Sequence, residues 1–302
     1  MRVLITGANG QLGNCFRFIS QAYKNITFFF TCKEEFDIGD KEAVEVYVKE
    51  HSIETIINCA AYTAVEEAQN QSLQAYTINA KAVAVLARIA KECALRLVHV
   101  STDYVFDGRH YKPYEETDIP NPINVYGASK YEGECSLREI NPKGCIIVRT
   151  SWLYSPFGHN FVKTMLRLGH EKEEIRVVCD QIGAPTFGVD LAHVIMHLLT
   201  QQSVQEECQT YHYQNEGALS WYDFAKEIMK MAKLPARIEP IRSLEYPTQA
   251  KRPYMALLDT TKIKTEYGVK IPYWKDSLKV CLNEVVRDMP IHEIKPNRQG
   301  NF

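Results

Sequence analysis

The chain has 302 residues, of which 45% are hydrophobic and 24% charged, the composition of a globular protein with one large domain or two ordinary ones. Its 35 basic and 37 acidic residues give a formal net charge of -2, so charge gives no reason to expect nucleic acid or an anionic membrane as a partner. No apolar run approaches the roughly 20 residues that span a bilayer. Because an apolar strand follows Met1 and Arg2 directly, we expect no signal peptide and a cytoplasmic protein.

The cysteines give no sign of a metal site or a disulfide framework. There are nine of them, and no two have CxxC spacing, which excludes zinc ribbons and thioredoxin-like motifs. An odd number without a signal peptide argues against a secreted disulfide scaffold. We therefore expect reduced thiols and no bound metal.

The first half of the chain alternates short apolar segments with amphipathic stretches. Continuous apolar strands that alternate with helices are typical of a parallel sheet covered on both faces. This pattern predicts an α/β fold with a doubly wound, mostly parallel sheet of Rossmann type. The expected strands are 3–6, 26–31, 55–59, 97–101 and 146–150, and the expected helices lie near 12–19, 40–50 and 71–93.

The rhythm changes after about residue 150, where prolines and longer loops become frequent. Helices are still expected at 160–168, 189–200, 220–232 and 275–287. We predict a dinucleotide-binding domain at 1–150, to which some later segments return. A smaller α/β substrate-binding lobe would span 151–287, and a polar C-terminal tail would span 288–302.

A glycine-rich turn follows the first strand. Gly7, Gly10 and Gly13 form a G-x-x-G-x-x-G pattern between a strand and a helix. Glycines here permit a tight turn, let the backbone approach a pyrophosphate, and let the helix pack close to the sheet. The helix N-terminus then presents free N–H groups to the phosphates. The turn predicts dinucleotide binding, with a plain strand–helix turn as the alternative.

The choice between NADPH and NADH stays open. An acidic residue at the end of the second strand would bind the ribose hydroxyls of NAD, and none is present. Lys33 could instead favour the extra phosphate of NADP, although a solvated surface lysine is equally compatible with this position. Asp37 could contact the adenine, or it could belong to a helix N-terminus.

Tyr126 and Lys130 have the i, i+4 spacing that places two side chains on one helix face. A nearby ammonium lowers the pKa of a phenol, and a tyrosine tuned in this way can exchange a proton with a carbonyl or alcohol oxygen. An exposed helical pair is the alternative. Thr102 ends the fourth strand, where parallel sheets bind ligands, and can hydrogen-bond the same substrate oxygen.

Together these features resemble the extended short-chain dehydrogenase/reductase superfamily and, within it, the dTDP-4-dehydrorhamnose reductase family. The resemblance covers about residues 1–285 and includes segments outside the general superfamily motifs. These segments are GANGQLG at 7–13, FDI at 36–38, NCAAYTAVEEA at 58–68, STDYVFDG at 101–108, NVYGASKYEGE at 124–134, RTSWLY at 149–154, HNFVKTMLRL at 159–168, DQIGAPT at 180–186 and KRP at 251–253.

The resemblance implies specific roles. NADPH or NADH would reduce the 4-keto group of dTDP-4-dehydro-6-deoxy-L-mannose to give dTDP-L-rhamnose, a precursor for polysaccharide synthesis. Tyr126 would be the acid, with Lys130 and Thr102 as its catalytic partners. The remaining cofactor contacts would be Gly7, Gly10, Gln11, Leu12, Gly13, Asp37, Ile38, Ala60, Ala61, Tyr62, Thr63 and Ser101, and the sugar-nucleotide contacts Thr102, Asp103, Trp152, Asn160, Lys163, Gln181 and Arg252.

Three alternatives remain. A nucleotide-sugar dehydratase would share the Tyr/Lys pair, but dehydratases of this superfamily have Asp-Glu after the threonine, whereas Asp103 is followed here by Tyr104. An epimerase is the second alternative. The third is a non-catalytic NADP-binding subunit of the kind that regulates methionine adenosyltransferase, although the retained Thr102, Tyr126, Lys130 and Trp152 favour an enzyme.

Metal binding and assembly are predicted from what the sequence lacks. His193 and His197 are spaced i, i+4, but an apolar helix packed on the lobe explains them better, and no third ligand is evident. Some family members pair subunits through magnesium held by a glutamate just after the glycine turn. Asn14 and Cys15 occupy those positions here, so we expect a monomer or a weak homodimer.

Overall fold

The computed structural model describes residues 1–201 and 205–288. At its centre is a six-stranded sheet in the order β10-β5-β4-β3-β1-β2, with every neighbouring pair parallel. This confirms the predicted doubly wound parallel sheet. The strands are β1 (Arg2–Thr6), β2 (Thr27–Phe30), β3 (Thr55–Asn58), β4 (Arg96–Thr102), β5 (Ile146–Thr150) and β10 (Gln209–His212).

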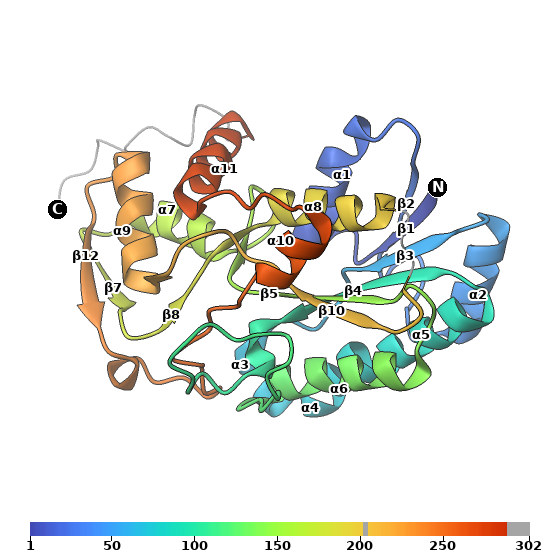
Figure 1. Cartoon of the computed structure of the whole chain (residues 1–302). Coiled ribbons are helices and arrows are strands. Elements are labelled where there is room, and N and C mark those ends of the chain that lie inside the picture. Colours follow the sequence, from blue (N-terminus) through green and yellow to red (C-terminus); the bar gives the residue numbers. More distant parts are fainter. Residues whose placement is uncertain (202–204, 289–302) are drawn as a thin grey trace.

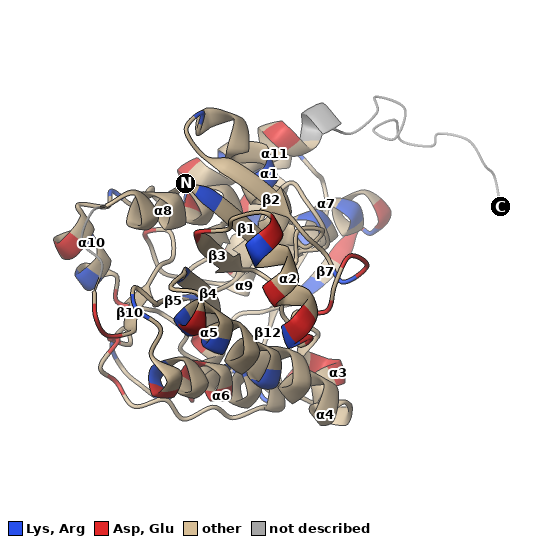
Figure 2. Cartoon of the chain, turned by 90° about the vertical axis from the view of Figure 1, so that its right-hand side faces the viewer, with Lys and Arg blue, Asp and Glu red and all other residues tan. Residues whose placement is uncertain are grey.

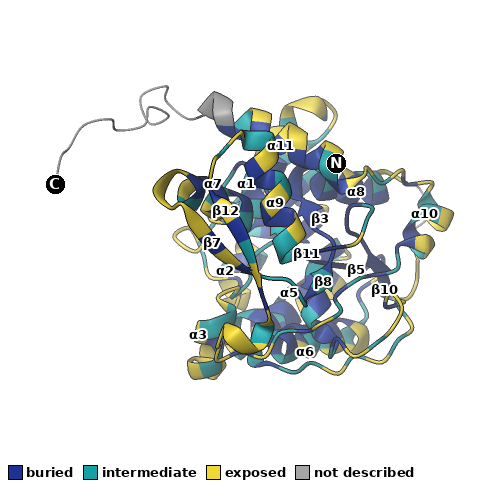
Figure 3. Ribbon diagram, turned by 90° about the vertical axis from the view of Figure 1, so that its left-hand side faces the viewer, coloured by how far each residue is buried: buried dark blue, intermediate teal, exposed yellow. Residues whose placement is uncertain are grey.

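The strand residues alternate between two hydrophobic cores. Val3 and Ile5 of β1 belong to a core on one face of the sheet, whereas Leu4 between them belongs to the core on the other face. Side chains of a strand point alternately to opposite faces, so a strand that is apolar throughout needs cover on both. The dark blue central strands in Figure 3 show this burial.

Helices supply that cover on both faces (Figure 1). Their apolar residues divide between the same two cores, which confirms the predicted layers. One face carries α1 (Gln11–Ile19), α8 (Gly188–Thr200), α10 (Thr261–Tyr267) and α11 (Trp274–Asp288). The other carries α2 (Lys41–Glu50), α5 (Ala82–Glu92) and α6 (Val125–Ile140). The helix predicted near 71–93 is interrupted, since α3 (Val65–Asn70), α4 (Ser72–Tyr76) and a π-helical turn η2 (Thr77–Lys81) precede α5.

The second half of the chain builds a smaller layer beside the sheet and also contributes β10 to the sheet edge. All four helices predicted there are present, while residues 289–302 of the predicted tail lie outside the described residues. This layer contains α7 (Phe161–Glu171), α9 (Trp221–Ala232) and the parallel pair β7 (Glu174–Val178) and β12 (Arg237–Ile241). The second half also has the short strands β6 (Leu153–Tyr154), β8 (Ile182–Gly183), β9 (Thr186–Phe187) and β11 (Leu219–Ser220) and the short helix η4 (Ser243–Glu245). Two more short helices, η1 (Ser20–Ala22) and η3 (Asp103–Val105), lie in the first half.

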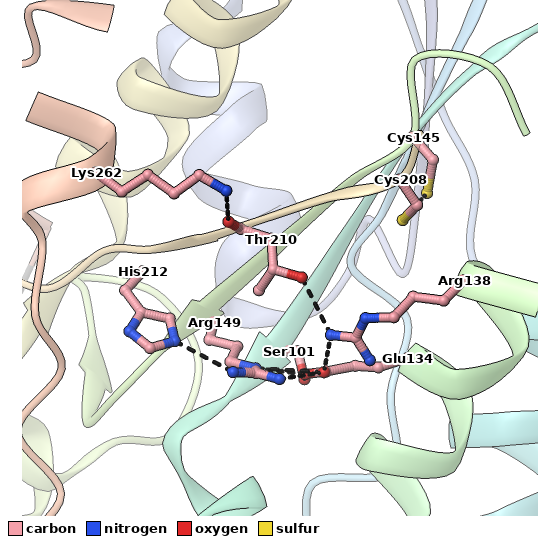
Figure 4. Close-up of polar contacts among 9 residues, drawn as sticks. All are labelled: Ser101, Glu134, Arg138, Cys145, Arg149, Cys208, Thr210, His212 and Lys262. Atoms are coloured by element: carbon pink, nitrogen blue, oxygen red, sulfur yellow. Dashed lines mark hydrogen bonds and ion pairs between the residues drawn. The ribbon is translucent and has the colours of Figure 1, made fainter. Parts of the chain in front are cut away.

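A buried ionic network fastens α6 to the sheet (Figure 4). The Glu134 carboxylate on α6 accepts hydrogen bonds from Arg149 of β5 at 2.7 Å, from Arg138 at 2.8 Å and from the Ser101 hydroxyl of β4 at 2.6 Å. A fully buried carboxylate is tolerated only when it is paired and hydrogen-bonded in this way. The network therefore fixes the helix that carries Tyr126 and Lys130 against the end of β4.

The distribution of surface charge and the state of the cysteines do not point to a particular function. Figure 2 shows basic and acidic positions intermixed along α2 and α5. No helix in the ranges 1–201 and 205–288 is long and apolar enough to cross a membrane. The nine cysteines are free thiols, and the sulfurs of Cys145 and Cys208 lie 3.0 Å apart at the start of β5 and β10 (Figure 4).

Candidate active site

The predicted cofactor turn lies where the strand order reverses, between β1 and β3. Gly7 follows β1 with a φ of +64°, and a Cβ at this position would lie 2.7 Å from the Cα of Ala60 after β3. A Cβ at Gly13 would lie 2.5 Å from the Cα of Ala8. Gly10 begins α1 and no side chain caps its free N–H groups. A tight turn at an uncapped helix N-terminus fits a pyrophosphate.

Two further residues of the glycine turn have different surroundings. The Gln11 amide donates to the Leu153 carbonyl at 3.1 Å, while its own Oε1 is buried without a partner. Leu12 is buried in the core between α1 and the sheet. Gln11 therefore offers an unused acceptor beside the turn, whereas Leu12 holds the helix in place.

The residues expected at the adenine have separate structural tasks. Asp37 is exposed, and its Oδ1 accepts a hydrogen bond from the Gly39 N–H at 2.8 Å. Ile38 is buried in the core on the α2 face. Asp40, three residues on from Asp37, caps α2. Lys33 is exposed and lies beyond the end of β2.

One asparagine holds the segment after β3 in position. Asn79 on the π-helical turn accepts from the Tyr62 N–H at 2.8 Å and donates to the Tyr62 carbonyl at 3.0 Å. Its amide also donates to the Ser129 hydroxyl of α6 at 3.0 Å. These bonds fix the backbone at Tyr62, in the segment from the half-buried Ala60 and Ala61 to the exposed Thr63.

Tyr126 lies in the first turn of α6, which Asn124 caps through the Gly127 N–H at 2.8 Å. The residue is partly exposed, but its phenol end is buried and is hydrogen-bonded to Thr102. Burial raises the pKa of Tyr126 to about 12. A phenol at this pKa is protonated across the physiological range and can donate its hydrogen to an oxygen beside it.

Lys130 does not act on Tyr126 as the sequence predicts. Its Nζ lies 2.7 Å from the Val100 carbonyl and 3.1 Å from the Nε2 of His99. Burial lowers the pKa of Lys130 to about 8, despite the nearby carboxylate of Glu134. The expectation that the ammonium lowers the pKa of Tyr126 is therefore wrong for this structure, because desolvation of the phenol outweighs a lysine held by other partners.

Asp103 begins the short helix η3 directly after β4. Its Oδ1 accepts from the Thr102 hydroxyl at 3.0 Å, and its Oδ2 is buried without a partner. Burial raises the pKa of Asp103 to about 7, so near neutral pH the carboxyl is partly protonated and its free oxygen can donate or accept. Ser101, in contrast, commits its hydroxyl to Glu134.

A cavity of about 1140 Å³ lies between α7, β7 and the loop after β12, and Lys251 in its wall accepts a hydrogen bond from Asn124, the N-cap of α6, at 2.8 Å. Two of the predicted sugar-nucleotide residues, Gln181 and Arg252, line it. Trp152 stacks on Trp221 of the cavity wall, with ring centroids 3.6 Å apart and an interplanar angle of 13°. Apolar walls with a few cations are suited to a nucleotide diphosphate.

Asn160 and Lys163 do not line this cavity. The Asn160 side chain caps α7 by accepting from the Lys163 N–H at 3.1 Å, and its amide donates to the Ser155 carbonyl at 2.8 Å. The Lys163 ammonium donates to the Pro156 carbonyl at 3.3 Å. Both side chains thus stabilise the helix that forms one wall of the cavity.

Two His residues singled out by spacing serve the packing of α8. His193 bonds the Tyr23 hydroxyl at 3.0 Å, and His197 bonds the Tyr267 carbonyl at 2.9 Å. Among the described residues, no group of three or more His, Cys, Asp or Glu is arranged to hold a metal ion.

Several residues of the site were missed from the sequence. His99 contacts Lys130, Trp221 stacks on Trp152, and Glu66 bonds Arg252. Only His99 gave a usable signal, because it interrupts the apolar strand at 97–100 and a polar residue there must find a partner. Trp221 and Glu66 lie in the first turns of helices, and nothing in the sequence around them indicated a role in the site.

The doubly wound sheet, the glycine turn at its switch point, and the Tyr/Lys pair after β4 define the class of extended short-chain dehydrogenases/reductases. Residues 1–287 match the family described as RmlD substrate binding domain. A relative from Aggregatibacter actinomycetemcomitans, a dTDP-4-dehydrorhamnose reductase, is 40% identical over 289 residues, which cover 92% of this chain and 97% of the relative. The chain belongs to the dTDP-4-dehydrorhamnose reductase family.

Solved structures agree with this assignment. A dTDP-4-dehydrorhamnose reductase from Clostridium acetobutylicum is 40% identical and superposes with a TM-score of 0.89 over 95% of this chain and all of that one. The enzyme from Bacillus anthracis, solved in complex with NADP, is 39% identical, with a TM-score of 0.87 over 94% of this chain and 99% of its own.

Proposed function

We propose that this protein uses NADPH or NADH to reduce the 4-keto group of dTDP-4-dehydro-6-deoxy-L-mannose, giving dTDP-L-rhamnose for polysaccharide synthesis. The observation that carries the proposal is how α6, which carries Tyr126, is attached at its N-terminal end: Asn124 donates to the carbonyl of Lys251 in the cavity wall at 2.8 Å, and Ser129 accepts from Asn79, which holds the segment after β3. The segment after β3 would line a dinucleotide and the cavity would hold a nucleotide sugar, so a carbonyl placed between them would meet a proton donor.

The glycine turn and the segment after β3 would hold the cofactor. Gly7, Gly10 and Gly13 would leave room for the pyrophosphate, Gln11 would offer its free Oε1 to a hydroxyl of the cofactor, and Asp37 and Ile38 would contact the adenine. The backbone of Ala60 to Thr63, and that of Ser101, would form the surface against the nicotinamide half. When bound, the cofactor supplies the hydride.

The chain's own residues would then handle the proton. The Tyr126 hydroxyl donates its hydrogen to the oxygen that develops negative charge at carbon 4, and Thr102 holds that hydroxyl in place. Donors already positioned for the charged oxygen stabilise the transition state more than the ground state. Asp103 would offer its free Oδ2 to a sugar hydroxyl.

The nucleotide sugar would occupy the cavity beside this group. Trp152 and Trp221 present an aromatic surface, and Gln181 and Arg252 supply polar contacts. The buried Nε of Arg252 has no protein partner, which leaves a donor for the substrate. Asn160 and Lys163 would act indirectly, by holding α7.

Dehydration needs more than this site offers, and cofactor consumption distinguishes reduction from epimerisation. Elimination next to the keto group requires a second carboxylate after Asp103, where Tyr104 stands. The test is incubation with the keto sugar and reduced cofactor carrying deuterium at the transferred position. We expect one cofactor consumed per sugar and deuterium at carbon 4 of dTDP-L-rhamnose. An epimerised or dehydrated product without cofactor consumption would overturn the proposal. A stoichiometric complex with methionine adenosyltransferase, without sugar-dependent cofactor oxidation, would also overturn it.

We further propose a cytoplasmic protein that is a monomer or a weak homodimer, with its cofactor half at 1–150 and its substrate lobe at 151–287. The absence of a carboxylate at Asn14 and Cys15 supports assembly without a shared magnesium. Light scattering after gel filtration tests this. A tight dimer that dissociates on chelation would contradict it.

A further inference from the structure

A chain of buried polar side chains crosses the sheet behind Tyr126. It runs from Thr6 of β1 through Asn58 of β3 and His99 of β4 to Lys130 of α6, and each of these residues is at most 2% exposed. The links are 2.7 Å from Thr6 Oγ1 to Asn58 Oδ1, 3.0 Å from Asn58 Nδ2 to His99 Nδ1, and 3.1 Å from His99 Nε2 to Lys130 Nζ. Because each link is a direct contact between side chains, the donor and acceptor of each can be worked out from their neighbours.

The amide of Asn58 has only one orientation that satisfies its neighbours. The backbone N–H of Ala60 can only donate, and it lies 3.2 Å from Asn58 Oδ1. That oxygen also accepts from the Thr6 hydroxyl. The amide nitrogen must therefore face His99, and it can only donate there.

This orientation fixes the tautomer of His99. Its Nδ1 accepts from Asn58, so it carries no hydrogen. Complete burial holds the pKa of His99 well below its usual value, so the ring is neutral. A neutral imidazole has one hydrogen, which must then be on Nε2 and point at Lys130.

We propose that His99 is a positioning residue that stabilises the neutral amine form of Lys130. The imidazole Nε2–H donates to the lone pair of Nζ, and an amine hydrogen donates to the Val100 carbonyl at 2.7 Å. An ammonium has no lone pair and would meet the imidazole N–H donor to donor. Lys130 can therefore accept from His99 only while neutral, and an ammonium gives up this hydrogen bond and becomes available to other acceptors. That the ammonium would then serve Tyr126 rests on the proposed function, but the tautomer does not.

The other groups that face Lys130 do not reproduce this effect. Cys59 after β3 and Glu134 on α6 both favour the ammonium, and burial opposes it. Tyr126 is one turn earlier on the same helix. Among these groups only His99 is within hydrogen-bond distance of Nζ, so it is the group that couples the charge of the lysine to its position.

The test is nitrogen-15 NMR of the free protein with labelled histidine. We expect the His99 ring to carry hydrogen on Nε2 and none on Nδ1 throughout the pH range in which the protein is folded. Hydrogen on Nδ1, or a charged ring, would overturn the proposal. This measurement needs no variant and no cofactor.

A variant then tests the effect on Lys130. Asn58→Asp keeps both hydrogen bonds to Oδ1 but replaces the amide donor toward His99 by a carboxylate oxygen, which accepts. The imidazole hydrogen of His99 then moves from Nε2 to Nδ1. This leaves Nε2 free to accept from the ammonium of Lys130. We expect the pKa of Lys130, followed through its labelled Cε and assigned by its loss in Lys130→Met, to rise by about one unit or more. In the control Thr6→Val, where Ala60 still fixes the amide, both tautomer and pKa should stay as in the wild type.

An unchanged lysine titration in Asn58→Asp, with the tautomer moved, would overturn the proposal. The outcome is separate from that of the reductase assay. Turnover without the expected tautomer would refute this inference alone, and the expected tautomer without turnover would refute the proposed function alone.

Discussion

The guanidinium of Arg252 lies 2.9 Å from the carboxylate of Glu66, although 186 residues separate them in the chain. The other oxygen of Glu66 accepts from the backbone N–H groups of Gln249 at 2.9 Å and Ala250 at 3.2 Å. One side chain on α3, in the cofactor half, thus fastens the loop that forms part of the cavity wall. The two halves of the site are joined by this contact.

Glu66→Ala should therefore weaken substrate binding without affecting the cofactor. Charge-assisted hydrogen bonds contribute about 1.5–3 kcal/mol each, so we expect the KM for the nucleotide sugar to rise about tenfold or more. Steady-state kinetics and a separate titration of the cofactor check this. Glu67→Ala, an exposed neighbour on the same helix, is the control. Equal effects of the two substitutions would contradict the role of Glu66.

Gly7→Ala should damage both the fold and the cofactor site. Gly7 has a φ of +64° and its added Cβ would meet the backbone of Ala60 at 2.7 Å, which β3 holds in place. Gly268 offers a matched control, with a φ of +63° and nothing within 4 Å of an added Cβ. Gly268→Ala should cost only the left-handed strain, about 1–2 kcal/mol of unfolding free energy.

Denaturation in urea and titration with reduced cofactor separate the two glycine variants. We expect Gly7→Ala to lose more stability than Gly268→Ala and to bind the cofactor at least about tenfold more weakly, since the steric clash lies in the turn itself. Similar losses of stability and of cofactor affinity in both variants would contradict the role of the close approach between Gly7 and Ala60.

The buried carboxyl of Asp103 should make stability depend on pH. Its pKa is raised from 3.8 to about 7, so between these values the folded protein binds more protons than the unfolded chain. Stability then falls as the pH rises through this window, by up to about 4 kcal/mol for a shift of this size. Asp103→Asn, which keeps the acceptor for Thr102, removes that slope.

Urea denaturation of both proteins at pH 5 and pH 8 measures this effect. We expect Asp103→Asn to gain stability relative to the wild type on going from pH 5 to pH 8. Since all other ionisable groups are shared, they cancel in the comparison. A difference in unfolding free energy that is the same at both pH values would contradict a raised pKa for Asp103.

The sequence could predict the features that depend on residues close together in the chain. The strands, the helices and the glycine turn follow from periodicity and from the conformational freedom of glycine, so they were placed correctly. Tyr126 and Lys130 were found because one helix turn fixes their spacing. Their electrostatics were not, since burial of the phenol and the partners of the lysine come from β4, which no spacing rule connects to α6.

Long-range pairs were the other omission. Glu66 and Arg252 meet only because the chain returns to the cofactor half after the second lobe, and Trp152 meets Trp221 across a similar separation. Asn160 accepts from the Lys163 N–H and so caps the first turn of α7. An asparagine directly before an apolar helix commonly has this role, which could have been predicted from its position.

Tyr126→Phe tests the proton donor. The ring keeps its contact with Tyr104, whose centroid is 5.7 Å away, so the fold and cofactor affinity should persist. Loss of general acid catalysis lowers rates by about 10²–10⁴. We expect turnover to fall within that range while the dissociation constant of the reduced cofactor changes less than about twofold.

The most direct test is the loss of reduced-nicotinamide absorbance when the wild-type protein meets dTDP-4-dehydro-6-deoxy-L-mannose, with NADPH and NADH in turn. We expect sugar-dependent oxidation of at least one cofactor, with one equivalent consumed per sugar, and its near-complete loss in Tyr126→Phe. No oxidation of either cofactor by folded protein, or full activity in Tyr126→Phe, would contradict the account.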